Sequence, residues 1–451
     1  MKKLFILAAA ALLCINLSAK DKDEIVKTGY NIGPLPAVAF DADKGFQMGA
    51  ILQVFNYGDG HNYPNYDSKV YFEYSYYTKG SQLIQLRYDN KELIPGVRWC
   101  TALRANFDKA YDFYGFNGYQ SYYACDRILQ GKDKSSDSYI FSPYYRFHKN
   151  EFLLKSDFIG RITDHLQWEA GVFANYFKIG SIDRENINKG KEDNKKYPDT
   201  QLTLFEIYKS LGIISEDEAD GGLASGIRLG MVYDSRDKEG APTRGIWAEG
   251  HIAAALPVIS ENPYYRYSFT WRQYLPIISN DVLTFAYRLN YEGTIGDDAP
   301  FYALPYMTVM GEKQDLEGMG GYNTTRGLMR TRVVGLDMFN YNAEIRWRFA
   351  KFNLGKQNIA LGLSAFSDGA TVTRGKDLKN LSIFNAIPVP VYNQDKDSMH
   401  ITFGGGFRFI MNENFIVAAE YGTPLTHFQK NSPLYNQDGT GAFYINLGYL
   451  F

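Results

Sequence analysis

Three charged residues are the best candidates for a functional cluster: Arg326, Glu344 and Asp368. Arg326 lies in the glycine-rich stretch 318–328, where the backbone can turn tightly and aim one side chain. A guanidinium can bind a carboxylate through two parallel hydrogen bonds, and such a pair offsets much of the cost of removing both charges from water. These residue types can therefore form a buried ion pair. From spacing alone, three ordinary solvated charges are the slightly better interpretation.

The other reactive residue types show no pattern of a catalytic or metal site. The histidines have no metal-ligand spacing, and no Gly-x-Ser-x-Gly motif of a serine hydrolase occurs. The glycines at 318–321 lack the Lys-Ser/Thr ending of a phosphate-binding loop. We therefore expect no catalytic, cofactor-binding or metal-ligating residues, and no cofactor. The six histidines are His61, His148, His165, His251, His400 and His427.

Two neighbouring strands are predicted to carry the carboxylates. Residues 342–349 alternate between polar and apolar, which places Glu344 on one face and Ile345 and Trp347 on the other. The run 359–368 repeats the alternation and places Asp368 on its polar face. The loop before both strands offers them Arg326.

The composition favours a membrane-spanning β-structure. The chain has 451 residues with 36 Tyr, 30 Phe and 42 Gly, which suits strands with apolar faces and an aromatic belt at the membrane interface. The net charge of −2 gives no basic field, so we expect no nucleic acid as a partner.

The start of the chain predicts export. Residues 1–19 have the basic start, apolar run and small-residue end of a signal peptide, 20–33 form a short periplasmic segment, and 34–451 form the barrel. No later apolar run approaches the roughly 20 residues that a spanning helix needs, so membrane insertion depends on strands. Cys100 and Cys125 are as compatible with a disulfide as with two unpaired thiols.

Seventeen segments have the composition and length of strands, and a bacterial single-chain barrel has an even number. One segment is therefore wrong, either the first or the division near His148, and we expect sixteen strands. The segments are 35–41, 46–57, 69–78, 81–89, 97–106, 139–148, 151–163, 167–180, 222–235, 244–256, 263–275, 281–294, 338–350, 358–367, 399–410, 414–424 and 441–451.

Alternation along these segments places apolar residues on one face and polar residues on the other, as in a barrel with lipid outside and water inside. Short turns alternate with long polar loops, which predicts a periplasmic rim and an external rim. The last segment resembles the C-terminal signal of outer-membrane barrels. Its apolar face is Phe443, Ile445, Leu447, Tyr449 and Phe451.

The order of several motifs resembles the BamA-type barrels of outer-membrane assembly, two-partner secretion and chloroplast import, the bacterial surface antigen family. Arg326-Gly327-Leu328 is similar to the Arg-Gly-aromatic motif of that family's sixth loop, with Leu in place of the aromatic residue. The strand 342–347 has the family's glutamate as Glu344. The run 366–370 resembles its Phe-x-Asp-x-Gly motif, with the glycine one residue early. Upstream, 233–237 and 242–245 are similar to its strand-turn-strand unit.

This resemblance implies an all-β, transmembrane, antiparallel barrel of sixteen strands, with the sixth extracellular loop folded into the lumen. It implies that Arg326, followed by Gly327, docks on Glu344 and Asp368, which reverses the preference for solvated charges. The family usually carries polypeptide-transport-associated (POTRA) domains before the barrel. The short stretch before Pro34 leads us to expect a member without them.

The resemblance also implies a place and a role. We expect a protein of the Gram-negative outer membrane, not an enzyme, that assists the insertion or translocation of protein or lipid. The expected partners are outer-membrane lipid, a periplasmic accessory or receptor protein, and client outer-membrane or secreted proteins. A weak seam between the first and last strands is implied as the place where the wall parts. The alternatives are a passive channel or surface scaffold with a separate periplasmic partner and, least favoured, a barrel-embedded lipid hydrolase.

Overall fold

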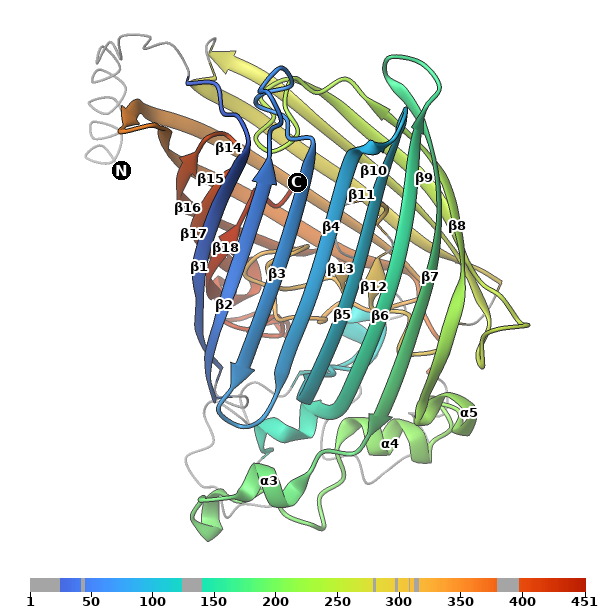
Figure 1. Ribbon diagram of the computed structural model, residues 1–451. Helices are drawn as coiled ribbons and strands as arrows, with labels where there is room; N and C mark the ends of the chain where they lie inside the picture. The colour runs from blue at the N-terminus through green and yellow to red at the C-terminus, as the bar shows by residue number, and fades with distance from the viewer. Residues whose placement is uncertain are drawn as a thin grey trace, which may run out of the picture.

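A single sheet of sixteen antiparallel strands forms the wall of the protein in the computed structural model (Figure 1). The structure describes residues 25–41, 45–123, 140–278, 281–296, 299–307, 309–311, 316–378 and 397–451. The expected signal peptide and Cys125 lie outside these residues. The wall strands are β1 Tyr30–Asp41, β2 Gly45–Asn56, β3 Ser68–Tyr77, β4 Gln82–Ile94, β5 Val97–Asp112, β6 Arg146–Arg161, β7 Leu166–Gly180, β8 Gly221–Asp234, β9 Gly245–Ala255, β10 Tyr264–Ile278, β11 Leu283–Ile295, β14 Asp337–Leu354, β15 Gln357–Arg374, β16 His400–Met411, β17 Phe415–Pro424 and β18 Ala442–Leu447.

Alternation of side chains gives the wall an apolar outer face and a polar inner face. On β3, Phe72 and Tyr74 are each 41% exposed, whereas Glu73 and Ser75 are buried. The expected sixteen-stranded all-β barrel is therefore confirmed. Among the described residues, no helix combines the length and the apolar character needed to cross a membrane.

Two predicted boundaries are wrong, and a third that was already suspected is corrected. The wall begins at Tyr30, inside the segment 20–33 that was expected to precede the barrel. Of the two suspected segments, the division near His148 is the wrong one, because β6 runs unbroken from Arg146 to Arg161 and the residues before it form a 3-10 turn. Lys149, within this strand, is a buried residue of the inner face. The last strand ends at Leu447, short of the C-terminus.

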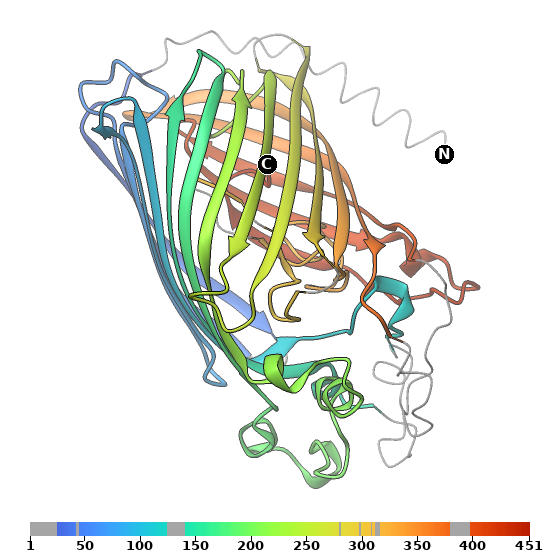
Figure 2. The ribbon, with the colours of Figure 1, turned by 90° about the vertical axis from the view of Figure 1, so that its right-hand side faces the viewer.

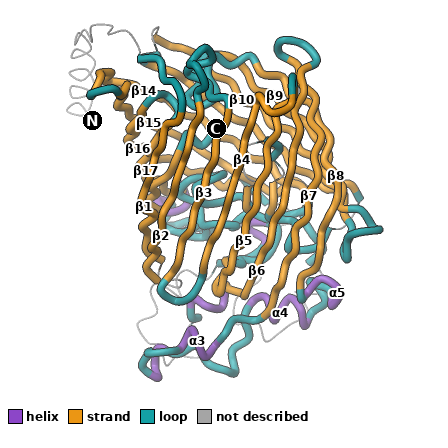
Figure 3. Tube along the Cα trace, in the orientation of Figure 1, coloured by secondary structure: helices purple, strands orange, loops and turns teal. Residues whose placement is uncertain are grey.

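The two rims of the barrel differ as expected. Short turns and the N-terminal end of the described chain lie at the upper end in Figure 1, and the long loops with their helices lie at the lower end. The tube in Figure 3 shows the same division of loops and helices. The long loop after β7 contains a helix, Leu204–Ser210, which Thr203 and Glu206 cap at its N-terminus. The helices are α3 Arg184–Asn188, α4 Leu204–Ser210 and α5 Glu216–Ala219, and the 3-10 turns are η2 Gly118–Gln120, η3 Ser142–Tyr145, η4 Asp193–Lys195 and η6 Leu425–Phe428.

The long loops share one aromatic core at their rim. Members from three separate loops, those after β5, β7 and β11, pack together, so the loops form a cap on the barrel. They include Phe113, Tyr144, Phe205, Phe301 and Leu336.

The segment between β11 and β14 contacts the inner face of the wall and contains the short strands β12 Tyr306–Met307 and β13 Leu316–Glu317. Lys155 Nζ of β6 donates to Val309 O at 2.9 Å, and Arg266 Nη1 of β10 donates to Ala303 O at 2.8 Å. Figures 1 and 2 both draw this segment within the ring of strands.

The two ends of the sheet are its edges. β1 pairs with β2 and β18 pairs with β17, and within the described residues no strand ladder joins β1 to β18. A contact at the short-turn rim spans this gap. The amide of Asn358, in β15, donates to Ile25 O and accepts from Ile25 N, both at 2.9 Å.

Candidate functional site

The loop 318–328 is folded by its own hydrogen bonds. Thr324 Oγ1 accepts from Gly320 N at 2.8 Å and donates to Gly318 O at 3.0 Å. Asn342 Nδ2 of β14 donates to Thr324 O at 2.6 Å, which fixes the loop to the wall. These contacts hold the backbone next to Arg326 in place.

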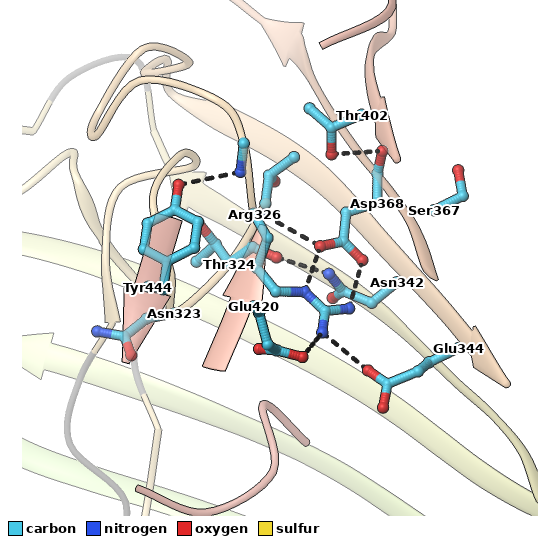
Figure 4. A network of polar contacts seen from close by, with 12 residues as sticks. Asn323, Thr324, Arg326, Asn342, Glu344, Ser367, Asp368, Thr402, Glu420 and Tyr444 are labelled. Carbon is cyan, nitrogen blue, oxygen red and sulfur yellow. Dashed lines mark hydrogen bonds and ion pairs between the residues drawn. The ribbon is translucent and has the colours of Figure 1, made fainter. Parts of the chain in front are cut away.

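Arg326 is buried among three carboxylates (Figure 4). Its Nε and Nη2 donate to the two oxygens of Asp368 at 2.9 and 3.1 Å, which is a bidentate pair. Its Nη1 donates to Glu344 Oε2 at 2.8 Å and to Glu420 Oε1 at 2.9 Å. The centroid of the Phe366 ring lies 3.5 Å from the guanidinium carbon, within the range of a cation–π contact.

The structure thus brings Arg326, Glu344 and Asp368 together, as the sequence suggested, and adds Glu420 from β17. Sequence reasoning missed Glu420, although it lies on the small and polar face of its strand beside Ala418 and Gly422. What links it to the loop is the neighbourhood of β15, β16 and β17 in the sheet.

Two further arginines balance the three carboxylates. Arg408 Nη2 lies 2.9 Å from Glu344 Oε1 and 2.6 Å from Glu420 Oε1, and Arg346 Nε lies 3.0 Å from Glu344 Oε1. Three cations therefore face three anions, all buried. An uncompensated charge would cost several kcal/mol here, so the cluster is stable only as a complete set.

The loop backbone touches the wall where both partners are glycine. Gly327 has φ +90°, and a Cβ on Gly422 of β17 would lie 2.8 Å from the carbonyl carbon of Arg326. Gly327 N donates to Tyr444 Oη of β18 at 3.0 Å. Gly327 therefore permits both the turn and the close approach.

Leu328 and Gly369 depart from the motifs that the sequence resembles, and both fit locally. Leu328 is buried with Met319, Val333 and Met338 in a small apolar cluster. A Cβ on Gly369 would lie 2.2 Å from Cε1 of Tyr341, so the glycine makes room for that ring.

The five C-terminal residues predicted to share one outward face do not share one environment. Phe443 and Ile445 are 63% and 64% exposed on β18, and Leu447 ends the strand. Phe451 is buried, its carbonyl accepting from Arg346 Nη2 at 3.0 Å, and the centroid of the Tyr449 ring lies 4.0 Å from the Arg346 guanidinium carbon. The chain turns off the strand at residue 448, where the glycine has φ +85°, so the single apolar face to the last residue was a wrong expectation.

Comparison with known proteins gives one family. The Omp85 superfamily domain matches residues 181–451, and no curated protein sequence matches the chain. Among solved structures, BamA from Haemophilus ducreyi lacking POTRA domains 1–3 is similar at 16% identity and a TM-score of 0.51, over 94% of this chain and 70% of that one. CdiB from Escherichia coli is similar at 8% identity and a TM-score of 0.48, over 88% of this chain and 59% of that one. The likeness to BamA shows a shared fold.

Proposed function

The chain belongs to the Omp85 superfamily, and from that premise we propose that it assists the insertion or translocation of client proteins at the Gram-negative outer membrane, with the loop 318–328 braced in its lumen. The barrel is an outer-membrane protein of the insertion and translocation class. The client class follows from the family, in which such barrels handle outer-membrane or secreted proteins. A non-enzymatic role belongs to the same proposal.

The observation that carries the proposal is the environment of Arg326. Burying a loop guanidinium among three carboxylates and an aromatic ring has a large desolvation free energy, since each charge must be taken out of water. Its effect is to hold the loop against β14, β15 and β17, close to the last strand. The brace therefore fixes the inner side of the wall beside the edge of β18.

The edges supply the mechanism. β1 has twelve residues and β18 has six, so the first edge is longer than the last. An edge strand presents unpaired N–H and C=O groups that can pair with an incoming strand. In the proposed mechanism β1 offers these groups to a client strand while the braced loop keeps β14 to β17 in place.

The test is reconstitution with a client. The purified protein in liposomes should accelerate membrane insertion of an unfolded outer-membrane barrel protein, and Arg326→Glu should abolish the acceleration. Leu202→Lys, in an external loop, serves as the matched control for an added charge and should retain it. Equal insertion rates with and without the protein would contradict the proposed function.

A passive channel is the second candidate, and the same preparation separates the two. A channel would carry a steady ionic current across a planar bilayer without any effect on client insertion. The cross-lumen contacts of Lys155 and Arg266 with 303–309 oppose an open pore, which is why insertion or translocation is preferred.

A further inference from the structure

The turn between β8 and β9, residues 235–244, reaches far from the strands that it joins. At one side, Glu239 Oε1 accepts from Lys91 Nζ of β4 at 2.9 Å, and its Oε2 lies 3.4 Å from Arg98 Nη1 of β5. In the strand order, β6 and β7 separate these strands from β8. In the sequence, this stretch is identified only by its resemblance to a strand-turn-strand motif, which assigns it no role.

At the other side, the same turn contacts β14 and the strands beyond it. Arg348 Nη2 of β14 donates to Ala241 O at 3.2 Å. Ala241 is fully buried in an apolar cluster with Ala360 of β15, Ile410 of β16 and Ile416 of β17. In addition, Lys238 Nζ forms an ion pair with Asp281 Oδ2 in the β10–β11 turn, at 2.8 Å.

Because the strands form a barrel, a short turn that contacts β4 and β5 as well as β14 to β17 must cross the interior. The residues it contacts agree, since Arg348, Ala360 and Ile410 are buried on the inner face. In Figure 1 the yellow-green turn extends across the upper end of the barrel. The turn therefore spans the lumen at the short-turn rim.

Hydrogen bonds within the turn hold its own backbone together. The Asp237 carboxylate accepts hydrogen bonds from Thr243 N at 2.9 Å, from Thr243 Oγ1 at 2.6 Å and from Arg244 N at 3.2 Å. These bonds close the turn on itself. Its contacts with β4 and β5 are of another kind: the side chains of Lys91, Arg98 and Glu239 are 19%, 20% and 29% exposed. Ion pairs in contact with water are weakened by salt and by loss of one charge.

We propose that residues 235–244 form a gate at the short-turn rim, which closes the lumen to solutes and opens when Glu239 leaves Lys91 and Arg98. Short turns face the periplasm in outer-membrane barrels, so the gate controls entry from that side. The gate is distinct from the brace, because the turn and the loop 318–328 are held by different residues of the wall.

A single cysteine inside the lumen reports on the gate. Ser268 of β10 is buried on the inner face, between Arg266, which contacts the segment 303–306, and Arg272, whose guanidinium lies 5.5 Å from the Trp247 ring. Trp247 in turn stacks with Arg236 of the gate at 4.2 Å. The Ser268→Cys variant is made in a full chain in which Cys100 and Cys125 are replaced by serine, and its reaction with a charged, water-soluble maleimide is timed.

The variant Glu239→Gln keeps the shape of the side chain and removes the charge. In the Ser268→Cys chain it should speed labelling of the introduced thiol several-fold over the control Glu192→Gln, which removes one charge from an exposed ion pair with Lys195 in the external loop. Equal labelling rates in two variants that both remain heat-resistant barrels would overturn the gate.

If Glu239→Gln does not fold, a second measurement still tests the gate, because it leaves the sequence of the turn unchanged. At 1 M salt the Debye length falls to about 3 Å, so the pairs of Glu239 are screened. Raising the salt should speed labelling of the Ser268→Cys variant that keeps its own Glu239. Labelling that is independent of salt would also overturn the proposal.

Discussion

At the scale of residues, the central feature is the buried Arg326 and the three carboxylates that it contacts. The types of Arg326, Glu344 and Asp368 and their faces were readable from the sequence, because alternation along a strand fixes which side chains share a face. The role of Glu420 could not be read from the sequence, since its contact with Arg326 depends on β17 lying next to β16 in the sheet. The inward turn of the last residues, such as Phe451, was also missed, because an alternating sequence cannot show where pairing stops.

A prediction at this scale concerns Gly422. In Gly422→Ala the new methyl group would meet the carbonyl of Arg326 at 2.8 Å, so the loop must move off β17 and the ion pairs must lengthen. We expect a lower temperature for the loss of the folded band on cold gel electrophoresis.

The matched control for Gly422→Ala is Gly250→Ala in β9. There the nearest atom would lie 3.8 Å from the new methyl group, an ordinary contact. If both variants kept the heat resistance of the unchanged protein, the close approach of loop and wall would be disproved.

At the scale of elements, strand existence was predicted well and strand ends were not. Periodicity identifies a strand, but β6 continues through Lys149 because a lysine can face a polar lumen. The β8–β9 turn shows the same limit, since its sequence predicts a turn and its contacts across the barrel are tertiary. Because charged contacts hold this turn, we expect its stability to depend on pH.

The pH prediction concerns Asp281, which holds the gate through Lys238. Burial raises the pKa of Asp281, but Lys238, Thr243 and Arg348 lower it from 3.8 to about 2. A carboxyl whose folded pKa is depressed contributes stability that is fully present above its ordinary pKa and is lost as the pH falls through the folded value. The heat resistance of the unchanged protein should therefore exceed that of Asp281→Asn at neutral pH, and the difference should shrink between pH 3.8 and about 2. A difference that is constant over this range would refute the role of Asp281.

At the scale of the whole molecule, a chain with an apolar outer face and a polar inner face forms a barrel, and the Omp85 match agrees with the motifs in its C-terminal half. The long loops pack together at one rim, the β8–β9 turn contacts opposite sides of the wall at the other rim, and the loop 318–328 contacts β14. The edges β1 and β18 remain the part of the wall with the fewest backbone bonds, and at the short-turn rim Asn358 of β15 contacts Ile25, which precedes β1.

A prediction at this scale tests which face meets lipid. Leu229, near the middle of β8, is 55% exposed on the outer face. A lysine near the centre of the hydrocarbon layer costs about 2–4 kcal/mol in a transmembrane barrel, so Leu229→Lys should lower heat resistance and yield in membranes. Leu202→Lys, at a loop residue that is 44% exposed, should change neither. Equal behaviour of the two variants would place Leu229 away from lipid.

The account depends most on the pairing of Arg326 with Asp368, whose two side-chain contacts of 2.9 and 3.1 Å are separate from those of Arg346 and Arg408 with Glu344. A double-mutant cycle on Arg326→Gln and Asp368→Asn, measured by urea unfolding in lipid, isolates this pair. Each single change should cost roughly 3–5 kcal/mol, as for a broken buried ion pair. The double variant should cost clearly less than the sum of the two. Additive losses, or losses below about 0.5 kcal/mol, would contradict the brace.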